Sequence, residues 1–84
     1  MRVTLKLFAT LTDYLPATAQ RSNLLELEVP TGTTIPELIA PYGLPPKLVH
    51  LVLVNGHYIA PEQRPQTALK EGDVLAIWPP IAGG

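Results

Sequence analysis

Two short segments of this sequence alternate strictly between apolar and polar side chains, and each predicts a β-strand with one buried face. In residues 2–8, RVTLKLF, every second residue from Val3 to Leu7 is apolar. In residues 24–29, LLELEV, leucines and a valine alternate with two glutamates. A period of two fits a strand, whereas helical side chains repeat every 3.6 residues. The chain is therefore predicted to begin with two half-buried strands, joined by a loose connection with room for a helical turn near Leu11–Leu15.

Only one helix is predicted, and it is short. Thr34 and Glu37 have the spacing of a capping box, and Pro36 is acceptable in the first turn of a helix. Pro41 and Gly43 follow closely and are expected to end the helix after about two turns. The side chains expected to face the core are Ile35, Leu38 and Ile39.

The second half of the chain again predicts strands. Residues 49–54, VHLVLV, are apolar enough for a central strand, and the Asn-Gly pair that follows is a strong signal for a two-residue hairpin turn. A short return strand is expected from residue 57, and a turn at residues 71–73 leads into a last strand at 74–78. The order of elements predicts an α+β fold in which a sheet of about five strands packs on one short helix.

Composition excludes several classes of function. The 84 residues suffice for one domain, and the net charge of −1 gives no electrostatic case for binding nucleic acid or an anionic membrane. The absence of cysteine excludes a disulfide framework, a thiolate nucleophile and a cysteine-ligated metal. The opening residues do not resemble a signal peptide, and no apolar stretch approaches the ~20 residues of a membrane span. We expect a cytoplasmic protein.

Few polar residues form a pattern that indicates a catalytic or metal-binding role. His50 and His57 lie across the predicted hairpin without a carboxylate cluster, and we interpret them as ordinary strand and turn residues. Glu26 and Glu28 share the solvated face of a strand, and Asp73 is expected to stabilise its turn. No catalytic residue and no metal site is predicted.

Several motifs, in this order of elements, resemble the ubiquitin-like sulfur carriers, which have the β-grasp fold. The motifs are LFATL at the first strand, VNG at 54–56, LKEGDVLAIWPP at 69–80 and AGG at 82–84. The double proline before the terminal Gly-Gly looks more like the small subunit of molybdopterin synthase (MoaD-like) than the thiamine sulfur carrier (ThiS-like). The resemblance implies a β-grasp domain at residues 1–78 and an extended tail at residues 79–84.

The resemblance also implies that the reactive group is the terminal carboxylate of Gly84. In the family, a partner enzyme adenylates this carboxylate with ATP, and the adenylate becomes a thiocarboxylate, so the carrier binds no cofactor itself. Gly83 and Gly84 lack Cβ atoms and suit a narrow channel, while Pro79 and Pro80 favour an extended path into it. At about 3.3 Å per residue, residues 80–84 would project the carboxylate roughly 16 Å.

The implied partners are an E1-like adenylating enzyme and the larger subunit of molybdopterin synthase, to which the catalytic side chains would belong. The sulfur would then go to a pterin precursor in molybdenum- or tungsten-cofactor synthesis. Three alternatives stay open: sulfur transfer for thiamine or another pathway, a ubiquitin-like modifier whose Gly84 is joined to a lysine amine, and an interaction module with an inert tail.

The surface that meets these partners is predicted near the root of the tail. Phe8 and Trp78 fall on the polar side of their alternating strands. If the first and last strands are neighbours, as in a β-grasp sheet, the two rings form an exposed apolar patch that Leu53 extends. Such patches mark protein contacts, and aromatic residues are common anchors in them. The alternative is that both rings complete the core or cover its edge.

Overall fold

The computed structural model describes residues 1–80, and its strands and single α-helix follow the predicted order. Short 3₁₀ helices occupy much of the remaining chain, including residues Ala9–Tyr14, Ala17–Ala19 and Pro61–Gln66. The sheet and helix elements are β1 (Arg2–Leu7), β2 (Leu24–Glu28), α1 (Ile35–Ile39), β3 (Leu51–Val54), β4 (His57–Tyr58) and β5 (Val74–Trp78).

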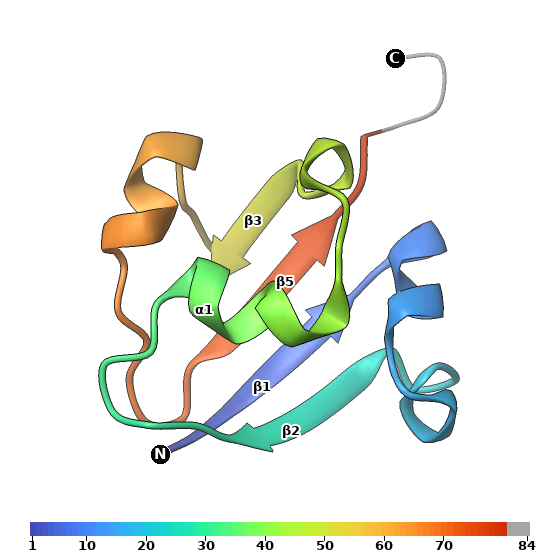
Figure 1. Ribbon diagram of the computed structural model, residues 1–84, viewed down its shortest axis with the longest axis horizontal. Helices are drawn as coiled ribbons and strands as arrows, with labels where there is room; N and C mark the ends of the chain where they lie inside the picture. Colours follow the sequence, from blue (N-terminus) through green and yellow to red (C-terminus); the bar gives the residue numbers. More distant parts are fainter. Residues whose placement is uncertain (81–84) are drawn as a thin grey trace.

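The strands form one mixed sheet in the order β2-β1-β5-β3-β4. The central strands β1 and β5 are parallel, and all other neighbours are antiparallel. Figure 1 shows α1 lying across one face of this sheet, opposite the two central strands. A mixed five-stranded sheet that curves around one helix is the β-grasp arrangement, so the predicted fold is confirmed.

Helix α1 begins and ends as its sequence predicts. The backbone N–H and the hydroxyl of Thr34 both donate hydrogen bonds to Oε1 of Glu37, at 2.9 and 3.0 Å. The α-helix ends at Ile39, and a 3₁₀ turn over Ala40–Tyr42 carries the chain to Gly43, whose φ of 67° lies in the left-handed region. Glycine adopts this conformation without steric cost, so it closes the helical segment.

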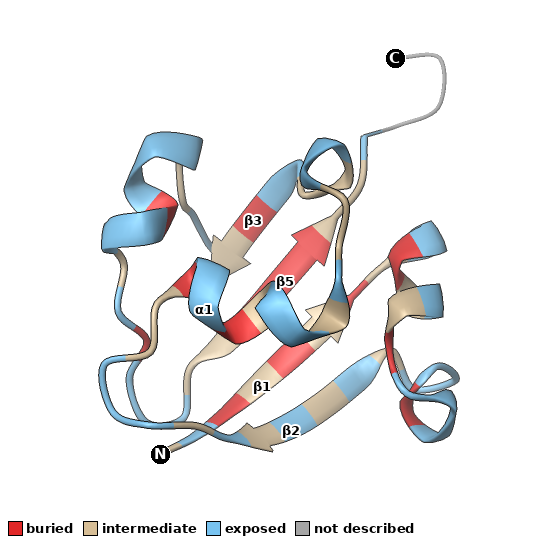
Figure 2. Ribbon diagram, viewed as in Figure 1, coloured by how far each residue is buried: buried red, intermediate tan, exposed pale blue. Residues whose placement is uncertain are grey.

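The hydrophobic core lies between α1 and the face of the sheet that α1 covers (Figure 2). Alternate residues of β1 and β5 supply its centre, while Ile35 and Leu38 reach it from the helix. The connection between β1 and β2 is more ordered than the loose connection that we expected. A 3₁₀ helix over Ala9–Tyr14 overlaps the expected helical turn, and Leu11, Leu15 and Ala19 are buried in the same core. The apolar residues of this connection therefore add to the core beside those of α1.

Two turns that are distant in the sequence hold each other in place. Asn55 and Gly56 both have positive φ, 52° and 83°, as a type I′ hairpin turn requires. The Asn55 side chain donates a hydrogen bond to Asp73 Oδ1 at 2.8 Å and accepts one from the Val74 N–H at 2.9 Å. Asp73 also accepts from the Lys70 N–H, which confirms its predicted role in the turn. The contact fixes the start of β5 against the β3–β4 hairpin.

Candidate functional site

The residues at the root of the tail are placed by the parallel pairing of β1 with β5. Leu7 lies opposite Ile77 in this pair, so the residues that follow them, Phe8 and Trp78, come side by side on the face that α1 does not cover. Their rings stack with centroids 4.0 Å apart and planes only 3° from parallel. The Phe8 N–H also donates a hydrogen bond to the Ile77 carbonyl at 3.2 Å. The predicted pair of rings is therefore present, and both rings are half-buried.

Other apolar side chains extend this pair across β3 and β4. Leu53 lies opposite Ala76 of β5 and Tyr58 of β4, and Leu51 lies opposite Trp78. Leu51 is 37% exposed and Tyr58 is 57% exposed, whereas Leu53 is half-buried. We call the resulting surface the outer patch; its members are Phe8, Leu51, Leu53, Tyr58 and Trp78.

Sequence reasoning found three members of the outer patch and missed two. Leu51 could have been found from the same alternation that places Leu53 on the outer face, because the two residues are separated by two positions. Tyr58 could have been found from the turn, since a two-residue hairpin loop at Asn55 and Gly56 pairs Tyr58 with Leu53.

A buried arginine holds the chain segment that precedes β3. Arg64, only 8% exposed, donates hydrogen bonds to the carbonyls of Ile59, Val49 and His50, at 3.0, 3.1 and 3.0 Å. The His50 N–H in turn donates to the Trp78 carbonyl at 3.3 Å. These acceptors replace the water that the guanidinium loses on burial. Arg64 thus ties the segment before β3 to the end of β5, a role that no local sequence pattern indicates.

The predicted tail is only partly described. Pro79 is half-buried and Pro80 is exposed, and both follow β5 without joining the sheet. Gly83 and Gly84 lie outside the described residues, so the predicted threading and activation of the tail stay predictions.

The remaining polar candidates are dispersed. His50, His57, Glu26 and Glu28 are all exposed. Within residues 1–80, no group of three or more His, Cys, Asp or Glu residues is close enough to hold a metal ion. In the same residues, no helix has the length and apolar character needed to cross a membrane.

A five-stranded mixed sheet grasping one helix, with an apolar patch where the last strand leaves the domain, defines a ubiquitin-like protein of the β-grasp class. A model of the ThiS family matches residues 5–84, and the chain belongs to this family. The predicted resemblance to the MoaD/ThiS-like sulfur carriers is thereby confirmed. The comparison with curated proteins finds no match.

Three solved structures illustrate the likeness. The HVO 2177 protein of Haloferax volcanii is 26% identical with a TM-score of 0.75, and the match covers all of this chain and 87% of that one. SAMP1 from the same organism is 25% identical with a TM-score of 0.68, over the full length of both chains. A chain from the complex of subunits 1 and 2 of the Helicobacter pylori molybdopterin-converting factor is 26% identical with a TM-score of 0.61, again over both full lengths.

Proposed function

We propose that this chain is a sulfur carrier whose Gly84 carboxylate is converted to a thiocarboxylate, and that it serves as the small, non-catalytic subunit of molybdopterin synthase. The observation that carries the proposal is the outer patch, in which Trp78, stacked on Phe8, is the last residue before the tail. A partner that binds this patch receives the tail at a defined starting point.

The chemistry explains why the chain needs a partner with ATP. A free terminal carboxylate has a pKa of about 3.3–3.7, so at neutral pH it is an anion and a poor electrophile. When its oxygen attacks the α-phosphorus of ATP, pyrophosphate leaves and an acyl adenylate forms. Hydrosulfide then adds to the acyl carbon, AMP leaves, and a proton is released. The product is a thiocarboxylate on a chain that has no cysteine.

The outer patch suits two partners that bind in turn. An E1-like adenylating enzyme would bind it while the tail is activated, and the larger synthase subunit would bind it while sulfur is delivered. The likeness to a chain from a complex of molybdopterin-converting factor subunits 1 and 2 supports the second partner. Aromatic side chains such as Trp78 are frequent energetic anchors of such interfaces.

The experiment is a mass measurement on the carboxyl terminus. We expect that the chain, incubated with its activating enzyme, ATP and sodium sulfide, gains the mass difference between sulfur and oxygen, located at Gly84. Deleting Gly84 shortens the tail by roughly 3.3 Å. Since misplacement on the order of 1 Å costs about 100-fold in rate, activation should collapse. The matched control, Ala82→Gly, keeps the tail length and should be activated normally. Equal thiocarboxylate yield from the shortened chain would contradict the proposal.

The likeness to SAMP1, the small archaeal modifier protein 1 of Haloferax volcanii, gives a second candidate. A ubiquitin-like modifier would use the same adenylate, but a lysine amine of a target protein would displace AMP and form an isopeptide bond. Mass spectrometry of cell extracts distinguishes the two candidates. Conjugates linked through Gly84, in place of the thiocarboxylate, would establish the modifier.

A further inference from the structure

We infer that the free edge of β2 and the groove beside it bind an extended peptide segment with basic and apolar residues at alternate positions. This inference does not depend on sulfur transfer, because it concerns the opposite end of the sheet from the tail. It rests on the unpaired backbone of β2, on the apolar wall beside it and on the charges at its rim.

The hydrogen-bonding pattern shows which backbone groups of β2 are free. Met1 and Val29 exchange hydrogen bonds, with the Met1 amino group donating to the Val29 carbonyl at 2.8 Å and the Val29 N–H donating to the Met1 carbonyl at 2.9 Å. Such hydrogen-bonded pairs recur at every second residue of an antiparallel ladder. The backbone N–H and C=O groups of Leu27 therefore also point toward β1. The N–H and C=O groups of Glu26 and Glu28 therefore point away from β1, at the outer edge of the sheet.

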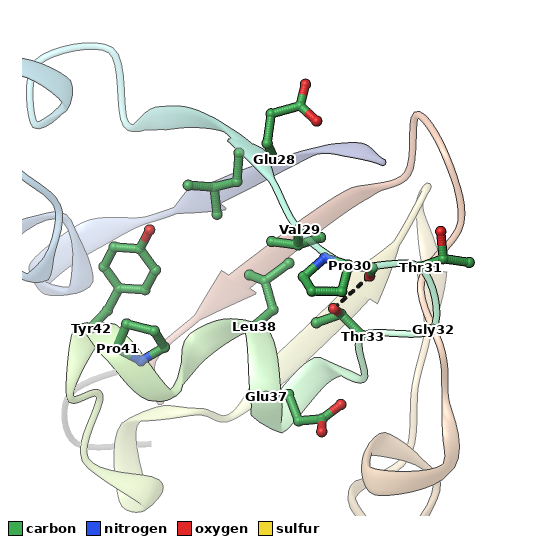
Figure 3. Close-up of a pocket in the computed structure, with 11 residues that line it drawn as sticks. Glu28, Val29, Pro30, Thr31, Gly32, Thr33, Glu37, Leu38, Pro41 and Tyr42 are labelled. Atoms are coloured by element: carbon green, nitrogen blue, oxygen red, sulfur yellow. Dashed lines mark hydrogen bonds between the residues drawn. The ribbon is translucent and has the colours of Figure 1, made fainter.

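A groove of about 590 Å³ lies beside the end of β2, between this strand and α1 (Figure 3). Figure 3 shows Val29 and Leu38 facing each other across it, with Tyr42 and Pro41 closing one end. Burial raises the pKa of Tyr42, so its ring stays a neutral part of the wall. An added strand would place every second side chain against this apolar surface.

The charges at the rim select a basic partner. Glu28 and Glu37 line the groove, and among its described lining residues there is no lysine, arginine or histidine. Hydrogen bonds from Thr34 lower the pKa of Glu37, which keeps it ionised at neutral pH. Glu28 is paired with Arg2 Nε at 3.1 Å and lies 4.0 Å from the amino terminus. The side chains of Glu28 and Arg2 are both exposed. Another cation can therefore replace Arg2 at little cost in free energy.

Strand geometry predicts which residue types the bound peptide carries at alternate positions. A residue paired directly with Glu26 has its side chain on the outer face, beside the Glu26 carboxylate, where a lysine or arginine is favoured. The next residue of the added strand faces the groove and is favoured when apolar. A second copy of this chain does not fit, because antiparallel pairing of β2 with itself about Glu26 would bring like-charged glutamates directly opposite each other.

The two surfaces can be occupied at once. Glu28 lies opposite Arg2 at the start of β1, whereas Phe8 and Trp78 follow the end of β1. The groove is therefore available while the outer patch and the tail engage another partner, and it suits a segment that tethers the carrier to a larger assembly.

The first test is a titration of the isotope-labelled protein, followed by NMR, with an acetylated and amidated Lys-Val-Lys-Val-Lys-Val peptide. We expect the largest amide shifts at Glu26, Glu28, Leu38 and Tyr42. The matched Glu-Val-Glu-Val-Glu-Val peptide should cause no shifts there. Absence of binding by the lysine peptide, equal binding by both peptides, or largest shifts at Trp78 would each overturn the inference.

The second test separates strand pairing from charge attraction. Glu26→Gln removes only the charge. Glu26→Pro removes the charge and also the backbone N–H that points away from β1, so no hydrogen bond between β1 and β2 is lost. Loss of one backbone hydrogen bond predicts about fivefold weaker binding for the proline variant than for the glutamine variant. Equal affinities would overturn strand pairing.

Modified peptides give the same test without altering the protein. N-methylation of alternate residues yields two peptides, of which only one keeps the N–H groups that face β2. We expect the peptide without these N–H groups to bind at least fivefold more weakly than the peptide that keeps them. Equal binding by the two peptides would overturn the inference even if the proline variant failed to fold.

Discussion

The two faces of the sheet differ in their side chains and in what covers them: the inner face is apolar throughout, whereas the outer face is mostly polar along β1 and β2 and apolar near the tail. On the inner face, Leu5, Leu7, Leu75 and Ile77 all have an exposed fraction of 0% beneath α1 and the β1–β2 connection. On the outer face, alternate residues of the same strands and of their neighbours form the outer patch, whose Leu51 and Tyr58 are 37% and 57% exposed.

Apolar residues of one strand therefore serve two purposes, burial in the core on one face and contact with a partner on the other. Within residues 1–80 the structure contains a single short α-helix, and it covers only one face of the sheet. Antiparallel and mixed sheets tolerate a solvated second face when that face is polar. Here the end of the second face nearest the tail is apolar, as is typical of a surface that another protein covers.

Truncation of one leucine on each face should have very different effects on stability. Leu5→Ala leaves a cavity in the core and should lower the free energy of unfolding by about 2–5 kcal/mol. Leu51→Ala, on the outer face, should lower it by less than about 1 kcal/mol, because its side chain already contacts water. Urea unfolding monitored by circular dichroism measures both. Equal losses would show that the outer patch belongs to the core.

A charged substitution in the outer patch tests whether the outer face binds a partner. Trp78→Lys places a charge in the proposed interface, and we expect binding to the activating enzyme to weaken by about thirtyfold or more while the fold is kept. Isothermal titration calorimetry measures the affinity. Thr4→Lys, on the polar part of the same face, is the control and should bind normally. Unchanged binding by Trp78→Lys, or its unfolding, would refute the role of the ring as an anchor.

The smallest expected effect concerns the cap of the helix that covers the inner face. Hydrogen bonds from Thr34 lower the pKa of Glu37 in the folded protein below the usual value of a glutamate. The stabilisation is therefore complete above that value and is lost as pH falls through the folded pKa. Glu37→Gln can keep the cap without the charge, so the difference in unfolding free energy between the two proteins should shrink on acidification. A difference that is independent of pH would contradict this assignment.

Local patterns predicted much of this fold because each rests on interactions between residues close in the chain. The alternation in β1 and β2, the Thr34–Glu37 cap and the Asn-Gly turn are all present. The order of the β1–β2 connection was underestimated. Its buried residues Leu11, Leu15 and Ala19 are four positions apart, as on one face of a helix, but Pro16 interrupts a continuous α-helix and two short 3₁₀ helices form instead. Their burial depends on packing against the rest of the core.

By itself, the sequence determined the elements, their order and the family, because periodicity, caps, turns and the terminal motif are all local signals. The three-dimensional structure adds the contacts that no local signal indicates: the parallel stacking of the predicted neighbours Phe8 and Trp78, the carbonyls around Arg64 and the hydrogen bond from Asn55 to Asp73. It also decided that β2 keeps a free edge beside a groove. These contacts follow from strand order and register, and both are set by pairing between distant segments, which a period of two within one strand does not encode.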